Sequence, residues 1–235
     1  MAGNRRRKST KRNITAVLII SGIVLGLIFI GIDIGISKRQ SKDVESKEMR
    51  TLLVRKPKIP PLTSASEAFP DFGIREEYLP VNDYSRPGIE IGDIEKIVIH
   101  YTANPGTDAQ ANRDYFAGLA DTGQTYASSH FVIGLDGTII QCVPLNEIAY
   151  ASNEMNSCCI SIECCHPDET GEFSTATYNR CVALTAELCK YYQLDPQEDV
   201  IRHYDITGKL CPAFYVEYPE EWTMFLGFVE EKMKD

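Results

Sequence analysis

The longest run of apolar positions lies near the start of the chain, at residues 14–36, and contains a single charged residue, Asp33. A helix of this length, rising about 1.5 Å per residue, crosses the roughly 30 Å hydrocarbon core of a bilayer. A cleaved signal peptide is the alternative, because a basic segment precedes the run. The run is long for a signal peptide, however, and no small-x-small cleavage site follows before Lys38. The pattern therefore predicts an uncleaved transmembrane anchor.

Polar residues and prolines follow the apolar run and separate it from the rest of the chain, which is typical of an extended stalk. We expect a short cytoplasmic segment at residues 1–13, the anchor at 14–36, a stalk and lead-in at 37–79 and a folded domain at 80–235. Basic residues flank the anchor on both sides and weaken the positive-inside signal. The N-terminal Arg-Arg-Arg-Lys cluster still favours a cytoplasmic N-terminus, which places the domain outside the cell on a single-pass anchor.

Apolar positions in the C-terminal part predict strands and helices in alternation. Residues 94–101 and 159–164 are apolar at nearly every position, as in strands that are buried on both faces. Asp136-Gly137 joins two further apolar segments and is a strong hairpin signal. The strands are expected at 94–101, 130–135, 138–143, 159–164 and 200–203, and the helices at 108–119, 175–193 and 220–234. The alternation indicates an α/β fold with a mixed central sheet flanked by α-helices.

The charge of the chain is distributed unevenly and argues against a nucleic-acid partner. Residues 1–36 hold six of the 24 Lys and Arg residues and one of the 33 acidic residues, so the rest of the chain is more acidic than the net charge of −9 suggests. A domain of that charge is a poor candidate for binding nucleic acid or another polyanion through its bulk field. Any anionic substrate must be held by a local site.

Eight cysteines in an exported domain would ordinarily indicate disulfides. Four of them form two directly adjacent pairs, and adjacent cysteines rarely bridge each other. Cys181 and Cys189 lie two helical turns apart, too far for a bond. Small buried apolar side chains are the better interpretation for most of them. His166, beside Cys164 and Cys165, is a less favoured candidate for a second metal site.

His100, His203 and Cys211 form the main candidate for a metal site. Imidazole nitrogens and a thiolate are good zinc ligands, and three protein ligands leave a fourth position for water. His100 ends a buried strand, and a Thr-Gly turn between His203 and Cys211 can bring both to one ion. Glu163 ends another apolar strand and is a candidate base, and Lys209 is a candidate for stabilising negative charge.

Five segments of the chain carry a resemblance to a known family. They are Ile-Val-Ile-His-Tyr-Thr-Ala-Asn-Pro-Gly at 97–106, Ser-Ser-His-Phe-Val-Ile-Gly-Leu-Asp-Gly at 128–137, Gln-Cys-Val-Pro-Leu-Asn-Glu at 141–147, Ile-Ser-Ile-Glu at 160–163 and Arg-His-Tyr-Asp-Ile-Thr-Gly-Lys-Leu-Cys-Pro at 202–212. In order and spacing they resemble the zinc N-acetylmuramoyl-L-alanine amidases of the type 2 family, whose fold is shared with peptidoglycan recognition proteins and phage amidase-lysozymes. The resemblance covers roughly residues 80–225, and the set is far more specific than any one segment.

The resemblance implies a peptidoglycan hydrolase that cleaves the amide bond between N-acetylmuramoyl and L-alanine, using water activated by one zinc ion. It makes His100, His203 and Cys211 the zinc ligands, Glu163 the catalytic carboxylate and Lys209 the basic residue beside the third ligand. Many relatives have Asp at the third ligand position, so a cysteine there is an accepted variant.

One departure from the family pattern bears on the mechanism. Phage members place a catalytic Tyr just before the His-Phe strand, where this chain has Ser129, and Tyr126 lies three positions too early. A tyrosine-assisted mechanism is therefore disfavoured, and Glu163 is the main candidate for the base. The candidates for the substrate groove are Asn104, Asn112, Tyr126 and His130. Core packing is an equally good interpretation of that histidine.

Two other functions compete with a wall amidase. The first is a non-catalytic peptidoglycan-binding module, which the intact set of ligands counts against, because binding alone requires no activated water. The second is a general zinc peptidase, which the absence of His-Glu-x-x-His counts against. The expected partners are peptidoglycan and, through the single N-terminal helix, the membrane. The sequence carries no signal for an oligomeric state.

Overall fold

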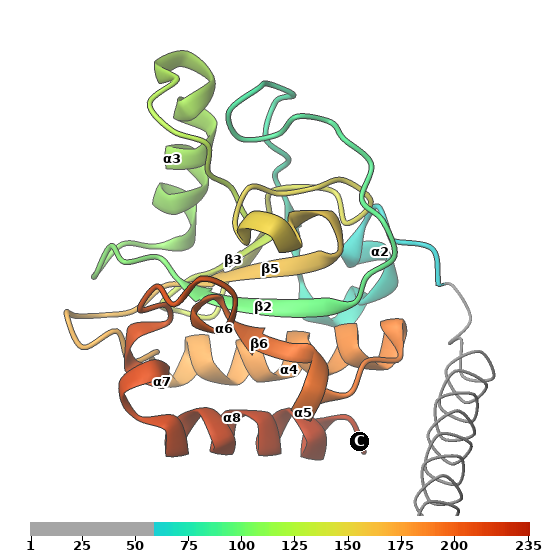
Figure 1. Ribbon diagram of the computed structural model, residues 1–235, viewed down its shortest axis with the longest axis vertical. Helices are drawn as coiled ribbons and strands as arrows, with labels where there is room; N and C mark the ends of the chain where they lie inside the picture. Colours follow the sequence, from blue (N-terminus) through green and yellow to red (C-terminus); the bar gives the residue numbers. More distant parts are fainter. Residues whose placement is uncertain (1–58) are drawn as a thin grey trace, which may run out of the picture. The chain divides into compact units, whose positions relative to one another are not determined.

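The computed structural model describes residues 59–235 (Figure 1). The predicted cytoplasmic segment at 1–13, the anchor at 14–36 and most of the stalk lie outside the described residues. Between residues 59 and 235, no helix combines the length and the apolar character needed to cross a bilayer.

A six-stranded sheet organises the described part of the chain, with the strand order β1-β4-β3-β5-β2-β6. The strands are β1 (Arg75–Glu76), β2 (Lys96–Tyr101), β3 (Phe131–Ile133), β4 (Ile139–Gln141), β5 (Cys159–Cys164) and β6 (Val200–Arg202). Every neighbouring pair is parallel except β3 and β4, which form the antiparallel hairpin expected at Asp136-Gly137. The expected mixed sheet is confirmed, with an additional edge strand, β1, that no sequence pattern predicted.

Helices cover both faces of the sheet (Figure 1). They are α2 (Ala65–Ala68), α3 (Ala109–Thr122), α4 (Thr175–Tyr192), α5 (Pro196–Asp199), α6 (His203–Thr207), α7 (Ala213–Glu217) and α8 (Pro219–Lys232), with the 3-10 turns η1 (Pro70–Phe72) and η2 (Asn153–Ser157). Helix α4 packs on one face and α8 covers α4 from outside, whereas α3 packs over β3 and β4 on the other face. Asp108 and Ser174 cap α3 and α4, each accepting a hydrogen bond from a backbone N–H in the first turn.

Side chains of the two central strands alternate between an apolar and a polar environment. Ile97 and Ile99 of β2 enter the main core together with α4, and the apolar residues of β5 do the same. Successive residues of a strand point to opposite faces, so His100 and Glu163 lie on the face away from α4. The alternation thus places the apolar core on one side of these strands and the candidate site residues His100 and Glu163 on the other.

The packed part of the chain begins earlier than the predicted domain boundary at residue 80. Ala65 is fully buried, and its backbone N–H donates a hydrogen bond of 2.9 Å to Oε1 of Gln141 in β4. Leu79 is also fully buried. Apolar residues of the segment 59–79 pack against the main core, and bonds to distant residues hold it there, such as that of 3.1 Å from the backbone N–H of Leu62 to the Tyr192 hydroxyl. The segment therefore belongs to the same compact unit as the predicted domain.

Candidate functional site

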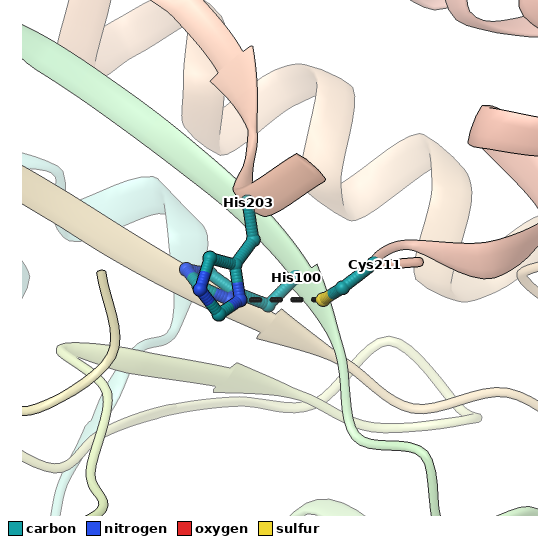
Figure 2. A group of neighbouring side chains, drawn as sticks. All are labelled: His100, His203 and Cys211. Carbon is teal, nitrogen blue, oxygen red and sulfur yellow. Dashed lines mark hydrogen bonds between the residues drawn. The ribbon is translucent and has the colours of Figure 1, made fainter. Parts of the chain in front are cut away.

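The carboxyl ends of three neighbouring strands bring the candidate residues together (Figure 2). His100 of β2 lies directly opposite Glu163 of β5 in the parallel register. His203 is the first residue after β6, which pairs with β2 on its other side. Cys211 follows in the loop after α6, and its carbonyl accepts a hydrogen bond of 2.9 Å from the backbone N–H of Tyr204. Parallel strands end at the same edge of a sheet, so segments far apart in the sequence converge here.

The geometry of His100, His203 and Cys211 fits a zinc ion. Within residues 59–235 they are the one group of three potential metal ligands whose donor atoms all lie within 4.8 Å of one another, and all three are buried. Sγ of Cys211 lies 3.8 Å from Nδ1 of His100 (Figure 2). Tetrahedral zinc, with a Zn–S distance of about 2.3 Å and a Zn–N distance of about 2.0 Å, holds such a pair of atoms about 3.5 Å apart.

Burial favours the uncharged forms of all three side chains. It lowers the pKa of His100 well below the usual 6.5, and repulsion by His203 and Lys209 acts in the same direction. Burial also lowers the pKa of His203. It raises the pKa of the Cys211 thiol to about 12. Zinc binds neutral imidazole and thiolate, so metal binding has to displace the proton of Cys211 but none from the histidines.

Glu163 is a desolvated carboxyl group next to the metal ligands. Its Oε1 lies 4.0 Å from Nδ1 of His100, and its buried Oε2 has no hydrogen-bond partner among the described residues. Burial raises the pKa of Glu163 to about 8, opposed by the positive charge of Lys209. A group that titrates near neutrality can both accept and return a proton. Ser129, by contrast, is fully buried and donates to the Ser161 carbonyl, so it contributes nothing to this site.

A cavity of about 490 Å³ opens beside the metal ligands. Glu163 and Lys209 line it on the ligand side, and Asn112 and Tyr126, two of the expected groove residues, line it elsewhere. Tyr126 is 63% exposed, so its ring is accessible to a substrate. The cavity is also lined by Tyr115, Tyr150, Asn153 and Asn156, which no sequence motif distinguishes.

Two expected groove residues lie outside this cavity. Asn104 is exposed in the turn before α3, where its carbonyl accepts a hydrogen bond from Thr107. His130 is buried in the fold: its Nδ1 accepts from the backbone N–H of Ser161 (3.0 Å), and its Nε2 donates to the Glu147 carbonyl (2.9 Å). His130 thus packs as a core side chain and does not line the cavity beside the metal ligands.

The buried position of His130 predicts a pH-dependent stability. Burial lowers its pKa from 6.5 to about 4, so between these values the unfolded chain binds a proton that the folded chain excludes. The stabilisation of the folded state by neutral His130 is complete above pH 6.5. It decreases by about 3 kcal/mol as the pH falls towards 4. We expect urea unfolding of metal-free protein to show the free-energy gap between wild type and His130→Gln shrinking by that amount from pH 7 to pH 4. A gap independent of pH would contradict the neutral, buried state of His130.

The remaining cysteines serve the core rather than a second metal site. All eight cysteines are free in this structure, and all except Cys158 are buried. No group of three ligands in the described part of the chain includes His166. Instead, Nδ1 of His166 donates to the Asp168 carbonyl at 2.7 Å.

Two residues that the sequence analysis did not single out contact the histidine ligands. Ser152 Oγ lies 3.1 Å from Nε2 of His100, and Asn153 Oδ1 lies 3.4 Å from Nε2 of His203. Ser152 precedes the 3-10 turn η2 and Asn153 is its first residue, between β4 and β5. No motif or period distinguishes the two from other residues of this connection.

Comparison with known proteins gives a consistent family match. A model of the family described as N-acetylmuramoyl-L-alanine amidase matches residues 91–214, just over half of the chain. The N-acetylmuramoyl-L-alanine amidase BlyA of Bacillus subtilis (strain 168) is 36% identical over 176 residues, which cover 66% of this chain and 46% of BlyA. CwlL of Bacillus licheniformis, also an N-acetylmuramoyl-L-alanine amidase, is 35% identical over 164 residues, which cover 64% of this chain and 44% of CwlL. The chain thus matches a little under half the length of these relatives.

Solved structures share the fold. The catalytic domain of XlyA matches with a TM-score of 0.56 at 27% identity, over 66% of this chain and 98% of that domain. PlyL matches with a TM-score of 0.57 over 66% of this chain and 96% of its own, and at 22% identity this likeness shows the fold alone. The expected arrangement of a mixed sheet between helices is thereby confirmed.

Proposed function

Because the chain belongs to the N-acetylmuramoyl-L-alanine amidase family, we propose that it is a zinc-dependent hydrolase that cleaves the amide bond between N-acetylmuramoyl and L-alanine in peptidoglycan. The observation that carries the proposal is the buried group of His100, His203 and Cys211 in one cavity with Glu163. A module that only binds peptidoglycan has no use for a metal site beside a carboxyl group whose pKa lies near neutrality.

Each residue of the group has a distinct role in the proposed reaction. His100, His203 and Cys211 hold one zinc ion, which when bound polarises the scissile carbonyl and lowers the pKa of water towards neutrality. Glu163 accepts a proton from the attacking water and delivers it to the departing amine of L-alanine. Lys209 stabilises the negative charge that develops on the carbonyl oxygen.

The proposal includes the position of the substrate and the place of the reaction. Asn112 and Tyr126 line the cavity that holds the metal ligands, and we assign them to the sugar–peptide groove. Residues 14–36 anchor the chain in the membrane with the catalytic part on the cell-wall side. This location follows from the apolar pattern of the sequence.

The proposed function is tested on isolated cell-wall sacculi with the full chain. We expect new N-terminal alanine to appear in the presence of zinc, to fall to background after removal of the metal with a chelator, and to return when zinc is restored. Dinitrophenylation of the digest identifies which amino group has been released.

Other products lead to other conclusions. New N-termini other than alanine would indicate a peptidase, and new reducing ends would indicate a glycosidase. Tight binding to sacculi without any release in the presence of zinc would make the chain a recognition module.

A further inference from the structure

We propose that Ser152 and Asn153 are positioning residues of the metal site, each fixing one histidine ligand in the tautomer and orientation that zinc requires. Histidine ligands of metals commonly donate their second ring N–H to a fixed acceptor, which orients the ring and sets the nitrogen that binds the metal. The inference rests on the metal site of the proposed function but is independent of the identity of the substrate.

Ser152 fixes the ring of His100 from the side opposite to Cys211. Nδ1 of His100 faces the sulfur at 3.8 Å, and Nε2 faces the Ser152 hydroxyl at 3.1 Å. Zinc held between Cys211 and His100 would bind Nδ1, the nitrogen that faces the sulfur, so the proton of the ring is on Nε2. Nε2–H then donates to the Ser152 hydroxyl. The lone pair of His100 is then on Nδ1, the atom that faces the other ligand.

Asn153 plays the corresponding role for His203. Its Oδ1 lies 3.4 Å from Nε2 of His203, and a carbonyl oxygen can only accept. The proton of His203 is therefore on Nε2, and Nδ1 keeps the lone pair. The two adjacent loop residues thus select the same tautomer in both histidines.

The loop that carries both residues is held by its own hydrogen bonds. Oδ1 of Asn156 accepts from the backbone N–H of Ala151 (3.1 Å) and of Ser152 (2.6 Å). Ser152 is fully buried, and Asn153 adopts a left-handed backbone with φ of 51°, which Asn tolerates better than most residues. The backbone that carries both acceptors is therefore fixed before the metal binds, which reduces the ordering that opposes binding.

The test measures zinc affinity of the full chain by competition with a chromophoric chelator. Ser152→Ala and Asn153→Gly are each expected to raise the dissociation constant for zinc about 10- to 100-fold. Glycine adopts the left-handed backbone without strain, so Asn153→Gly removes the acceptor alone. Asn153→Asp keeps an acceptor at the same position, and we expect it to bind zinc at least as tightly as wild type.

Ser129→Ala is the matched control, because Ser129 is as deeply buried as Ser152 but bonds to the Ser161 carbonyl. We expect it to lower stability without changing zinc affinity. If Ser152→Ala does not fold, the comparison of Asn153→Gly with Asn153→Asp decides. Zinc affinities equal to wild type in Asn153→Gly and in folded Ser152→Ala would overturn the proposal, whatever the activity on cell walls.

A second readout needs no metal. The chain has four histidines, so long-range ¹H–¹⁵N spectra of metal-free protein can report the tautomer of each. We expect the Nε2–H tautomer for His100 and His203 in wild type, a mixture for His100 in Ser152→Ala, and a mixture for His203 in Asn153→Gly. Unchanged tautomers in both variants would contradict the positioning role.

Discussion

Replacing Cys211 with serine is expected to slow wall hydrolysis at least about 1,000-fold, beyond the roughly 100- to 1,000-fold cost of removing one transition-state hydrogen-bond donor. Cys211 is the one ligand of the group that can supply a negative charge, because both histidines bind as neutral imidazoles. A serine hydroxyl keeps its proton and is a poor zinc ligand. Alanine release from sacculi measures the loss of activity, and the zinc content of the purified variant measures the loss of metal.

Cys211→Asp is the matched control for this change. A carboxylate also binds zinc, and the family resemblance suggests that Asp is accepted at this position. We expect the aspartate variant to retain zinc and a substantial part of the activity. Wild-type zinc content together with wild-type activity in Cys211→Ser would remove Cys211 from the ligand set.

Replacing Glu163 with glutamine is expected to lower kcat about 100- to 10,000-fold, the usual contribution of a positioned general base. Glutamine has nearly the same shape but cannot accept a proton from water. Zinc content should remain at the wild-type level, because Glu163 lies beside the ligands without belonging to the group of three. The two variants therefore separate loss of the metal from loss of the base.

Stability provides the control for the glutamine variant. The buried Oε2 of Glu163 has no hydrogen-bond partner among the described residues, and a desolvated carboxyl group in such a place costs stability. We expect the melting temperature of metal-free Glu163→Gln to equal or exceed that of wild type. A variant that melts lower and loses zinc would assign Glu163 a structural role, and one that keeps full activity would require another base.

The parts of the fold that were predicted correctly are those with a strong local pattern. Strand β5 appears with the bounds expected, and α3 and α4 begin at capping residues that the sequence displays. His100, His203 and Cys211 were found because their residue types carry zinc chemistry. Their convergence depends on the parallel register of β5, β2 and β6, which pattern alone does not determine.

The features that the sequence did not predict lack a strong local pattern. His130 has a side chain suited to a groove, but polar side chains are also used to satisfy the backbone in cores, as its bonds to the Ser161 N–H and the Glu147 carbonyl do. Ser152 and Asn153 are ordinary loop residues until the histidines are placed beside them. The segment 59–79 is fixed by hydrogen bonds of Ala65 to Gln141 in β4 and of Leu62 to Tyr192 in α4, which exist only in the folded chain.

The position of β1 bears on how molecules of this protein meet one another. An exposed strand edge offers unpaired N–H and C=O groups to any passing strand and is a common route to aggregation. Here β4 is covered by β1, which has only two residues, and the opposite edge is β6, with three. Strand β1 thus covers the edge of β4. Both edge strands of the described sheet, β1 and β6, are too short to serve as a template for intermolecular pairing.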